Sequence, residues 1–436
     1  MKVLAWTVSA LIGLATASPM QVTPGGPEDI IITEENTLNA TTIATFAPVR
    51  ILAASGGQLP LALVNNLASS NVHAYVTGLD PNGQLVMLKP DGSWYYPTST
   101  SSGIPVAITE NVAIPLGAEG TTKTITLPGY ISSGRVYFAD GTLKFYTVQA
   151  ATGATSLVEP SAVNPSDPSA NVNWGFIELT NTAAGGIYVN LSFVDFVGLP
   201  LGITLTDTSG GKNEARGLVT DAVEQICSEL TQQAKTDGQP WDELCMYSSN
   251  GQPLRALSPY NYLAGLSNSA FSSYWTSYID QVWAYYTRNK LTINTQAAAG
   301  LVSCSVTSGV LYCDGDNRGY AKPTASDIFG CNAGPFAIQG GDNSVHYAVV
   351  PRLCAAFHRS TFLIAGGSTQ PAVSSSRYYL ADPTNWYSSI VHDFQIDGRG
   401  YAFPYDDVTP TGGQDTSGLL ATTQPKLLTV YIGGDC

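Results

Sequence analysis

Charged residues are scarce in this chain: only 12% of its 436 residues are Asp, Glu, Lys or Arg. Basic residues are the scarcer kind, with 19 Lys and Arg against 33 Asp and Glu, so the net charge is −14. A surface of this sign repels polyanions, which argues against a nucleic acid or an anionic membrane surface as a partner. Neutral or cationic partners remain.

Long apolar runs are absent beyond the N-terminus. After residues 3–14, no stretch approaches the roughly 20 apolar residues that a membrane-spanning helix requires. That first run follows Lys2 and precedes Ala15-Thr16-Ala17, which is the arrangement of a secretory signal peptide. We therefore expect cleavage after Ala17 and a secreted mature chain without a membrane segment.

Most familiar catalytic motifs are also missing. The sequence contains neither of the phosphate-binding patterns G-x-x-x-x-G-K-[ST] and G-x-G-x-x-G, and it lacks the zinc-protease pattern H-E-x-x-H and the nucleophile motif G-x-S-x-G. The four histidines are scattered along the chain, and we expect structural roles for them. The carboxylates are the remaining candidates for chemistry, and neither a metal nor an organic cofactor is implied.

Seven cysteines all lie in the second half of the chain, and none forms the C-x-x-C pair of a zinc ribbon or a thioredoxin-like site. Disulfides are the usual state of cysteines outside the cell. One pair follows from geometry, because a two-residue turn at Ser308-Gly309 places Cys304 opposite Cys313 with Cα atoms roughly 4.5 Å apart. Proximity alone suggests two more pairs and one cysteine left over: Cys227–Cys245, Cys331–Cys354 and Cys436.

The first half of the chain has the pattern of a β protein. Residues 18–45 are a polar lead-in that contains the glycosylation sequon of Asn39. From residue 46 to 210, short apolar alternations are separated by turn dipeptides, which predicts an antiparallel sandwich or barrel. One of these dipeptides, Asp140-Gly141, predicts a hairpin over residues 135–146.

The second half predicts helices. From Asn213 the apolar spacing changes to 3.6 residues, which indicates a helix that ends at Gly238. A second, longer helix is predicted to begin after Ser258 and to extend to Tyr286, with apolar and aromatic residues on one stripe. Residues 211–390 are therefore expected to form a mixed helical domain, and the fold class is mainly β with an α/β part.

Two acids lie within apolar, strand-like segments. Glu178 and Asp195 are each flanked by aromatic and branched aliphatic residues on both sides. Burial raises the pKa of a carboxyl group, so one such acid can stay protonated while its partner stays ionised, as acid–base catalysis requires. The alternative is that both acids are structural and bind backbone amides or arginines.

Three blocks of sequence resemble one enzyme family. Residues 174–180, Trp-Gly-Phe-Ile-Glu-Leu-Thr, and residues 187–202, which contain Asn190-Leu-Ser192 and Asp195, resemble glycoside hydrolase family 64, the β-1,3-glucanases with a thaumatin-like fold. Residues 392–408 look like the acidic C-terminal segment that these enzymes share with thaumatin-like proteins. The blocks occur in the expected order and extend over nearly the whole mature chain.

The resemblance implies a β-barrel or sandwich domain, a mixed α/β domain, and a wide acidic cleft between them that admits a β-1,3-glucan chain. Residues 391–436 would return to the barrel and the cleft. Glu178 would be the general acid and Asp195 the general base of an inverting hydrolysis, and we expect a monomer. The same match implies four substrate-binding residues: Thr180, Ser192, Asp406 and Asp407.

The inverting mechanism makes a geometric demand on this pair. The two carboxyl groups should lie about 6.5–9.5 Å apart so that a water molecule fits between the general base and the sugar. If residues 181–186 closed a simple hairpin, Glu178 would pair near Val189, and Asp195 would lie about 20 Å away by strand rise. The chain must therefore bend before Asp195. Asn190 also begins a sequon, which we expect to carry no glycan because a glycan would block the groove.

Two other functions are open. A non-catalytic thaumatin-like protein that binds glucan is one, because aromatic, acidic grooves serve recognition as well as catalysis. An aspartic-type protease is the other, since Asp207 and Asp415 each begin an Asp-Thr-Ser-Gly segment. The extra residue before the glycine in both segments favours a turn or a cap over a protease loop.

Overall fold

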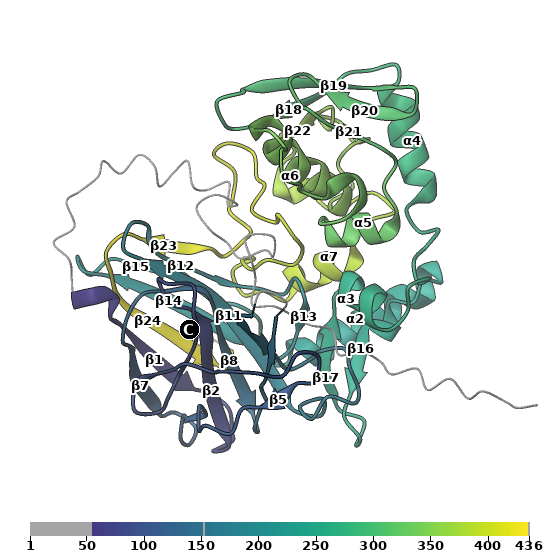
Figure 1. Cartoon of the computed structure of the whole chain (residues 1–436). Helices are drawn as coiled ribbons and strands as arrows, with labels where there is room; N and C mark the ends of the chain where they lie inside the picture. The colour runs from purple at the N-terminus through teal and green to yellow at the C-terminus, as the bar shows by residue number, and fades with distance from the viewer. Residues whose placement is uncertain (1–54, 151–152, 435–436) are drawn as a thin grey trace, which may run out of the picture.

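The computed structural model describes residues 55–150 and 153–434. The expected signal peptide, the sequon of Asn39 and Cys436 lie outside these residues. Figure 1 shows two parts side by side: a large structure of two sheets, and a group of helices with a smaller sheet. The expectation of a mainly β protein with an α/β part is confirmed.

Two sheets form a β-sandwich. The first contains β15 (Lys212–Ala215), β14 (Leu201–Asp207), β24 (Pro425–Ile432), β1 (Leu59–Asn65) and β7 (Thr122–Leu127), in spatial order. The second contains β23 (Leu420–Thr422), β12 (Gly186–Leu191), β11 (Asn173–Thr182), β8 (Ile131–Asp140), β2 (Val72–Leu79), β3 (Leu85–Leu88) and β4 (Trp94–Tyr95), with β6 (Ile114–Pro115) paired to β2.

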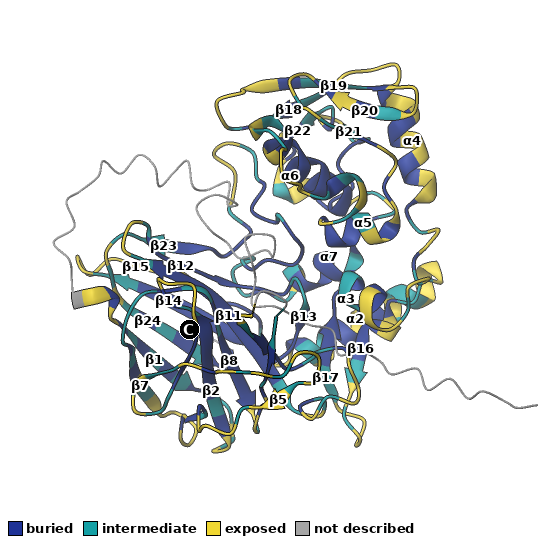
Figure 2. Ribbon diagram, viewed as in Figure 1, coloured by how far each residue is buried: buried dark blue, intermediate teal, exposed yellow. Residues whose placement is uncertain are grey.

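Alternation of side chains explains why the sheets pack. In β1, the leucines at 59, 61 and 63 are fully buried, while the residues between them are partly exposed. Because successive side chains of a strand point to opposite faces, this pattern gives the sheet one apolar face to bury against its partner. Figure 2 shows the sandwich strands as mostly buried, with exposed residues concentrated in the turns.

The C-terminal segment completes both sheets of the sandwich. β24 lies between β14 and β1 and runs parallel to β1, with Leu61 paired to Leu428. β23 extends the edge of the second sheet by pairing with β12. The last strands are therefore as much a part of the sandwich as the first ones.

Two short sheets flank the sandwich: β5 (Val106–Ala107), β9 (Tyr146–Gln149) and β10 (Thr155–Val158) form one, and β13 (Phe196–Val197), β17 (Pro253–Leu257) and β16 (Cys245–Tyr247) form the other. The helical part contains α2 (Ala222–Asp237), α3 (Pro259–Gly265), α4 (Thr276–Tyr286), α5 (Ala325–Gly330), α6 (Ser344–His358) and α7 (Trp386–Asp393). Its sheet contains β21 (Gly319–Tyr320), β20 (Val310–Cys313), β19 (Leu301–Thr307), β18 (Leu291–Asn294) and β22 (Thr369–Gln370). Short 3₁₀ helices occur at Ser55–Gly57, Asp242–Leu244, Gly334–Phe336 and Ser375–Arg377.

Within the described part of the chain, no helix combines the length and the apolar character needed to cross a bilayer.

The predicted hairpin over residues 135–146 is wrong. β8 does end at Asp140, but it pairs with β2 on one side and with β11 on the other. Because both edges of β8 are occupied, the chain cannot fold back on it after Gly141. It crosses instead to β9, which pairs with β10 and β5.

The first predicted helix is correct at its C-terminal end, and the second is correct at both ends, Ser258 and Tyr286, but is interrupted between them. Gly238 ends α2 with a left-handed φ of 70°, but the helix begins only at Ala222, because residues 212–215 pair with β14 as β15. Ser258 caps α3 by accepting a hydrogen bond from the backbone N–H of Asn261. The long helix is broken after Gly265, where a serine-rich segment forms turns and Phe271 adopts a left-handed φ of 56°, before α4 begins.

Three disulfides are present among the described residues. The bridge between Cys304 and Cys313 joins β19 to β20 at a Cα separation of 4.0 Å. Ser308 and Gly309 have φ values of 52° and 82°, as the two-residue turn of the prediction requires. The two pairs suggested by proximity also form: Cys227–Cys245 and Cys331–Cys354.

Removing the bridge in the Cys304→Ser/Cys313→Ser double variant is expected to lower the free energy of unfolding by about 2.7 kcal/mol, because a sequence separation of 9 residues closes a small loop. Urea unfolding of oxidised wild type and variant measures the difference. Dithiothreitol-treated wild type, which loses all the bridges, is the reference for a larger loss. An unfolding midpoint unchanged in the double variant would contradict the prediction.

Candidate active site

Glu178 lies at the centre of the second sheet. β11 runs between β8 and β12, and its register places Glu178 directly opposite Arg135 on one side and Asn190 on the other. Opposed residues of neighbouring strands project to the same face of a sheet, so the three side chains gather on one face. The side chain of Glu178 is only 7% exposed.

Asp195 reaches the same place by a bend in the chain. β11 and β12 form the simple hairpin considered above, but β12 ends at Leu191 and Ser192 bridges to Tyr401. The carbonyl oxygen of Asp195 then accepts hydrogen bonds from the backbone N–H of Ser258, at 2.9 Å, and from the side-chain amide of Asn261, also at 2.9 Å. The first turn of α3 thus fixes the backbone of Asp195.

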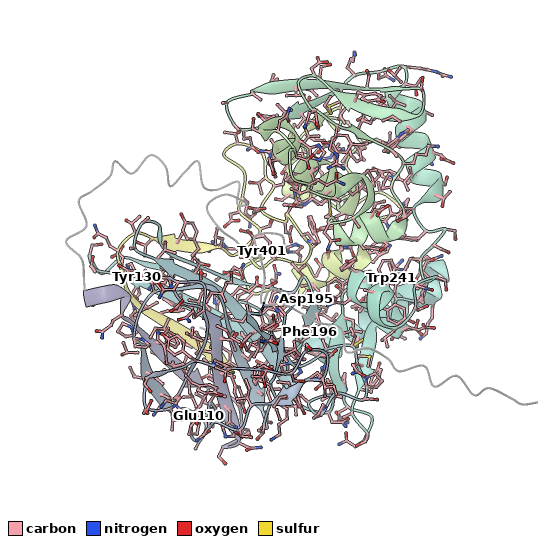
Figure 3. The ribbon with its side chains drawn as sticks, in the orientation of Figure 1. Glu110, Tyr130, Asp195, Phe196, Trp241 and Tyr401 are labelled. Carbon is pink, nitrogen blue, oxygen red and sulfur yellow. A yellow bond between two sulfur atoms is a disulfide. The ribbon has the colours of Figure 1, made fainter. Side chains whose placement is uncertain are left out.

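Figure 3 shows Asp195 and Tyr401 at the junction of the sandwich with the helical part. Tyr401 exchanges backbone hydrogen bonds with Leu191 and Phe193, at 3.0 and 2.7 Å. Tyr387 of α7 donates from its hydroxyl to the carbonyl oxygen of Phe193 at 2.7 Å. The segment that leads to Asp195 is therefore held from both parts of the molecule.

Arg135 joins the two acids. Its Nη2 lies 3.2 Å from Oε1 of Glu178 and 3.7 Å from Oδ2 of Asp195. Since both oxygens lie this close to one nitrogen, they cannot be more than about 7 Å apart. Nη1 of Arg135 donates to Oε2 of Glu159 at 3.0 Å, so three carboxyl groups surround one guanidinium.

The two candidate catalytic acids occupy different environments. Burial raises the pKa of Glu178 to about 7; the charge of Arg135 opposes this shift and the charge of Asp195 adds to it. The side chain of Asp195 is 40% exposed. A desolvated carboxyl that can hold a proton thus lies close to a second carboxyl that is open to solvent, and such a pair can serve as acid and base.

Thr180 and Ser192 lie close to Glu178 and Asn190. Thr180 follows Glu178 by two residues on the same face of β11, and Ser192 follows Asn190 by two residues at the end of β12. Thr180, Asn190 and Ser192 are buried. Among the described residues, the hydroxyl of Thr180 and the side-chain oxygen of Asn190 nevertheless lack a hydrogen-bond partner. Buried polar atoms are normally paired, so both atoms could accept a partner from a ligand.

Asp406 is not placed to bind a substrate, which corrects the expectation. Its side chain is fully buried, and its Oδ1 accepts a hydrogen bond from Arg359 at 2.8 Å. Its Oδ2 accepts from His392 at 2.8 Å and from the backbone N–H of Ala402 at 2.9 Å. Both oxygens are therefore engaged by the protein. Asp407 is buried as well, at 2% exposure, and does not offer an open carboxylate.

Asp207 and Asp415 each close a turn of their own. Oδ1 of Asp207 accepts from the backbone N–H groups of Ser209 and Gly211. Oδ1 of Asp415 accepts from the backbone N–H of Ser417, while its other oxygen pairs with Arg399. Each side chain has its own local partners, so the arrangement does not support a proton shared between the two. Over the described ranges, no group of three or more His, Cys, Asp or Glu is placed to hold a metal ion.

Two residues of this site were not found from the sequence. Arg135 is the basic residue of a strand otherwise made of apolar, small and hydroxyl side chains with one acid at its end, and that isolation was a usable signal. Glu159 follows β10 in an irregular segment and carries no comparable signal. Only the strand order, however, connects Arg135 to Glu178.

Two carboxyl groups brought together on a β-sandwich are an arrangement that suits the glycoside hydrolases, a class of enzymes that use such pairs as acid and base. The profile of the β-1,3-glucanase family, glycoside hydrolase family 64, matches residues 57–432. This chain belongs to that family.

Individual relatives of this chain are consistent with the family assignment. The chain is 26% identical over 373 residues to a glucan endo-1,3-beta-glucosidase of Cellulosimicrobium cellulans, a match that covers 84% of this chain and 64% of that protein. Among solved structures, it resembles a laminaripentaose-producing beta-1,3-glucanase in complex with laminaritetraose, with a TM-score of 0.74, 26% identity and coverage of 86% and 98%. A beta-1,3-glucanase domain from Clostridium beijerinckii shares the fold, with a TM-score of 0.66, 22% identity and coverage of 86% and 98%.

Proposed function

We propose that this chain is an endo-acting β-1,3-glucanase in which Glu178 is the general acid and Asp195 the general base. The observation that carries the proposal is the contact of both acids with Arg135, which brings together two residues 17 positions apart in sequence. Glu178 would donate its proton to the leaving glycosidic oxygen, and Asp195, which is open to solvent, would activate the attacking water. The chain spans 64% of the length of the curated relative. We therefore base the proposed activity on the residues of this chain's own site and not on the activity of that whole protein.

Inversion of the anomeric centre is part of the proposal. The limit of about 7 Å between the nearest oxygens includes the lower end of the range for inverting enzymes. It also includes the shorter separation of retaining enzymes, in which the second acid attacks the sugar directly. The anomer that is formed first distinguishes the two.

We also propose how a glucan chain would lie. The partner is an uncharged β-1,3-glucan, as the complex of the related enzyme with laminaritetraose supports. It would occupy a groove of thaumatin-like type between the sandwich, whose edge strand β15 extends past the expected boundary at residue 210, and the helical part. Within it, Thr180, Ser192 and Asn190 would contact sugar hydroxyls. Three disulfides support an extracellular place of action. We propose that the protein acts there as a monomer, after removal of residues 1–17.

The test is incubation of the protein with linear β-1,3-glucan, with product size followed by chromatography and the first anomer by ¹H NMR. We expect short oligosaccharides whose new reducing ends are first α. A β-1,4-glucan of similar length is the control for linkage. New reducing ends that are first in the β configuration would contradict inversion but not the glucanase activity. Absence of products, together with retained binding to insoluble glucan, would indicate the non-catalytic, glucan-binding alternative.

Thr180→Val is expected to raise KM for a soluble laminari-oligosaccharide about 5- to 10-fold and to change kcat less, because the variant loses one hydrogen bond to a sugar hydroxyl worth about 1 kcal/mol. Valine keeps the shape and the strand preference of threonine. Thr204→Val, at another buried threonine of the sandwich in β14, is the matched control. Equal KM values for wild type and Thr180→Val would contradict a role in binding.

A further inference from the structure

The interaction between Arg135 and Glu159 has no role in the acid–base pair as described so far. Their contact at 3.0 Å is the shortest ion pair that Arg135 makes. The side chain of Glu159 is only 4% exposed, which makes it more buried than those of Glu178 and Asp195. A carboxylate is rarely buried unless it is paired, so this position calls for an explanation.

Arg135 is held in one orientation. Its guanidinium lies 4.7 Å from the centre of the Phe176 ring, which fixes the plane of the group. Within that plane, Nη1 points to Glu159, while Nε and Nη2 point to Glu178 at 3.4 and 3.2 Å. Nη2 is also the atom nearest Asp195. Glu159 thus occupies one end of the guanidinium, and the candidate catalytic acids occupy the other.

Counting charges shows what Glu159 changes. With Arg135 and Glu178 alone, ionisation of Glu178 would neutralise a buried guanidinium, and an arginine this close typically lowers a carboxyl pKa by one to three units. A general acid with such a pKa would have lost its proton at neutral pH. With Glu159 present, the guanidinium is already neutralised, so ionisation of Glu178 would add excess negative charge to a poorly solvated site.

We infer that Glu159 is a positioning residue of the catalytic site: it binds and neutralises Arg135, so that Arg135 orients Glu178 and Asp195 without holding Glu178 in its ionised form. This inference rests on the proposed function, because it assigns a task to Glu178 as proton donor. It adds a third carboxylate to the pair, one that does not touch the substrate.

The charged and titratable groups around this arginine agree with the assignment. They are Glu159, Glu178, Asp195 and Tyr137, the last from the same strand as Arg135. Burial opposes the charge of Arg135, but the negative groups, with Glu159 first among them, hold the pKa of the guanidinium well above its usual value. Burial also holds the pKa of Tyr137 well above its usual value, so that phenol stays neutral and does not replace Glu159.

The experiment is the pH profile of kcat/KM on a soluble laminari-oligosaccharide for wild type, Glu159→Gln and Glu159→Asp. In Glu159→Gln, which keeps the size but removes the charge, we expect the alkaline limb to move down by about one pH unit. In Glu159→Asp, which keeps the charge, the limb should stay close to that of wild type. Glu119→Gln, which removes an exposed carboxylate from the turn before β7, is the control for a general change of charge.

A structural role alone would lower the activity of Glu159→Gln equally at every pH, because partial unfolding changes the amount of active enzyme and leaves the limb in place. An alkaline limb within about 0.2 pH unit of that of wild type would therefore overturn the inference. A second readout needs no turnover: ¹³C NMR titration of the Glu178 carboxyl, assigned with Glu178→Gln, should give a lower pKa in Glu159→Gln. If wild type cleaves no glucan, the proposed function fails, and the NMR titration alone decides whether Glu159 controls Glu178.

Discussion

Glu178→Gln is expected to lower kcat on linear β-1,3-glucan by about 10³-fold, in the middle of the range for a general acid. Glutamine has the shape of protonated glutamic acid and can still accept the hydrogen bonds of Arg135, but it has no proton to give to the leaving oxygen. The strand pairing around it should persist, so binding to insoluble glucan should be retained. The measurement is initial-rate kinetics together with a binding assay on the same preparation.

The matched variant is Asp195→Asn, which should lose a similar factor for a different reason. It cannot activate water, whereas Glu178→Gln cannot protonate the leaving group. An aryl laminari-oligosaccharide with a nitrophenolate leaving group needs no proton donor. Glu178→Gln should therefore recover much of its activity on that substrate, while Asp195→Asn should not. Equal recovery in both variants, or a loss of less than tenfold on glucan in either, would contradict the assigned roles.

The pH dependence of wild type follows from the same residue. Because burial raises the pKa of Glu178 to about 7, the proton donor is present below this pH and is lost above it. We expect kcat/KM, which reports the free enzyme, to fall about tenfold per pH unit on the alkaline side. Glu178→Gln should lack this limb in its residual activity, because glutamine does not titrate in this range.

Two features of the fold that could be derived from geometry depend on near neighbours in sequence. The turn at Ser308-Gly309 sets the register of its hairpin, so the pairing of Cys304 with Cys313 could be counted from the turn outward. The cap at Ser258 likewise depends on residues within one helical turn. Local geometry was sufficient in these cases, since the interactions join residues fewer than ten positions apart.

The failed predictions involve partners far away in the chain. The Asp140-Gly141 dipeptide has a local preference for a hairpin, but β8 is a central strand whose neighbours, β2 and β11, come from distant segments. The apolar residues before α2 have helical spacing, yet residues 212–215 pair with β14 and form the strand β15. Packing of a strand edge outweighs a weak local preference, and that packing is not visible in a local pattern.

The candidate site shows the same division. Glu178 and Asp195 could be singled out because their apolar flanks are local and because the surrounding blocks resemble a family. Arg135 and Glu159, which are 43 and 19 residues from Glu178 in sequence, could not be connected to it without the order β11–β8 and the path after β10. The resemblance also placed Asp406 among substrate-binding residues, although its neighbours Arg359 and His392 hold it inside the protein.

Asp406→Asn is therefore expected to reduce stability, by about 3–5 kcal/mol, rather than affinity for glucan, because breaking a buried ion pair leaves its cation without a partner. The amide of asparagine would also turn its NH₂ group toward a donor of Arg359, His392 or Ala402, all of which now donate to the carboxylate. Urea unfolding at pH 7 measures the loss. Asp280→Asn removes an exposed pair with Lys322 and should cost less than about 1 kcal/mol.

The pH dependence of this loss has a defined sign. Burial would raise the pKa of Asp406, but the charges of His392 and Arg359 and its hydrogen bonds hold that pKa below the ordinary value of 3.8. The stabilisation is thus present above about pH 3.8 and is lost as pH falls through the lower, folded value. The pKa of His392 is raised above 6.5, against the effect of burial, by Asp406 and Gln395, so its share is complete below pH 6.5 and is lost at higher pH. The difference between wild type and Asp406→Asn should be largest between these limits.

The kinetic constants of Asp406→Asn then separate a structural role from a binding role. The segment that contains Asp406 also contains Tyr401, whose backbone holds Leu191 and Phe193 in place before Asp195. Loosening that segment should moderately lower kcat per folded molecule, because Asp195 is held less precisely. The KM for a short laminari-oligosaccharide should stay the same. If Asp406 instead contacted the sugar, KM would rise with little loss of stability, because the removed contact would belong to the bound state and not to the folded one. Since both oxygens of Asp406 already accept hydrogen bonds from the protein, we expect the first result.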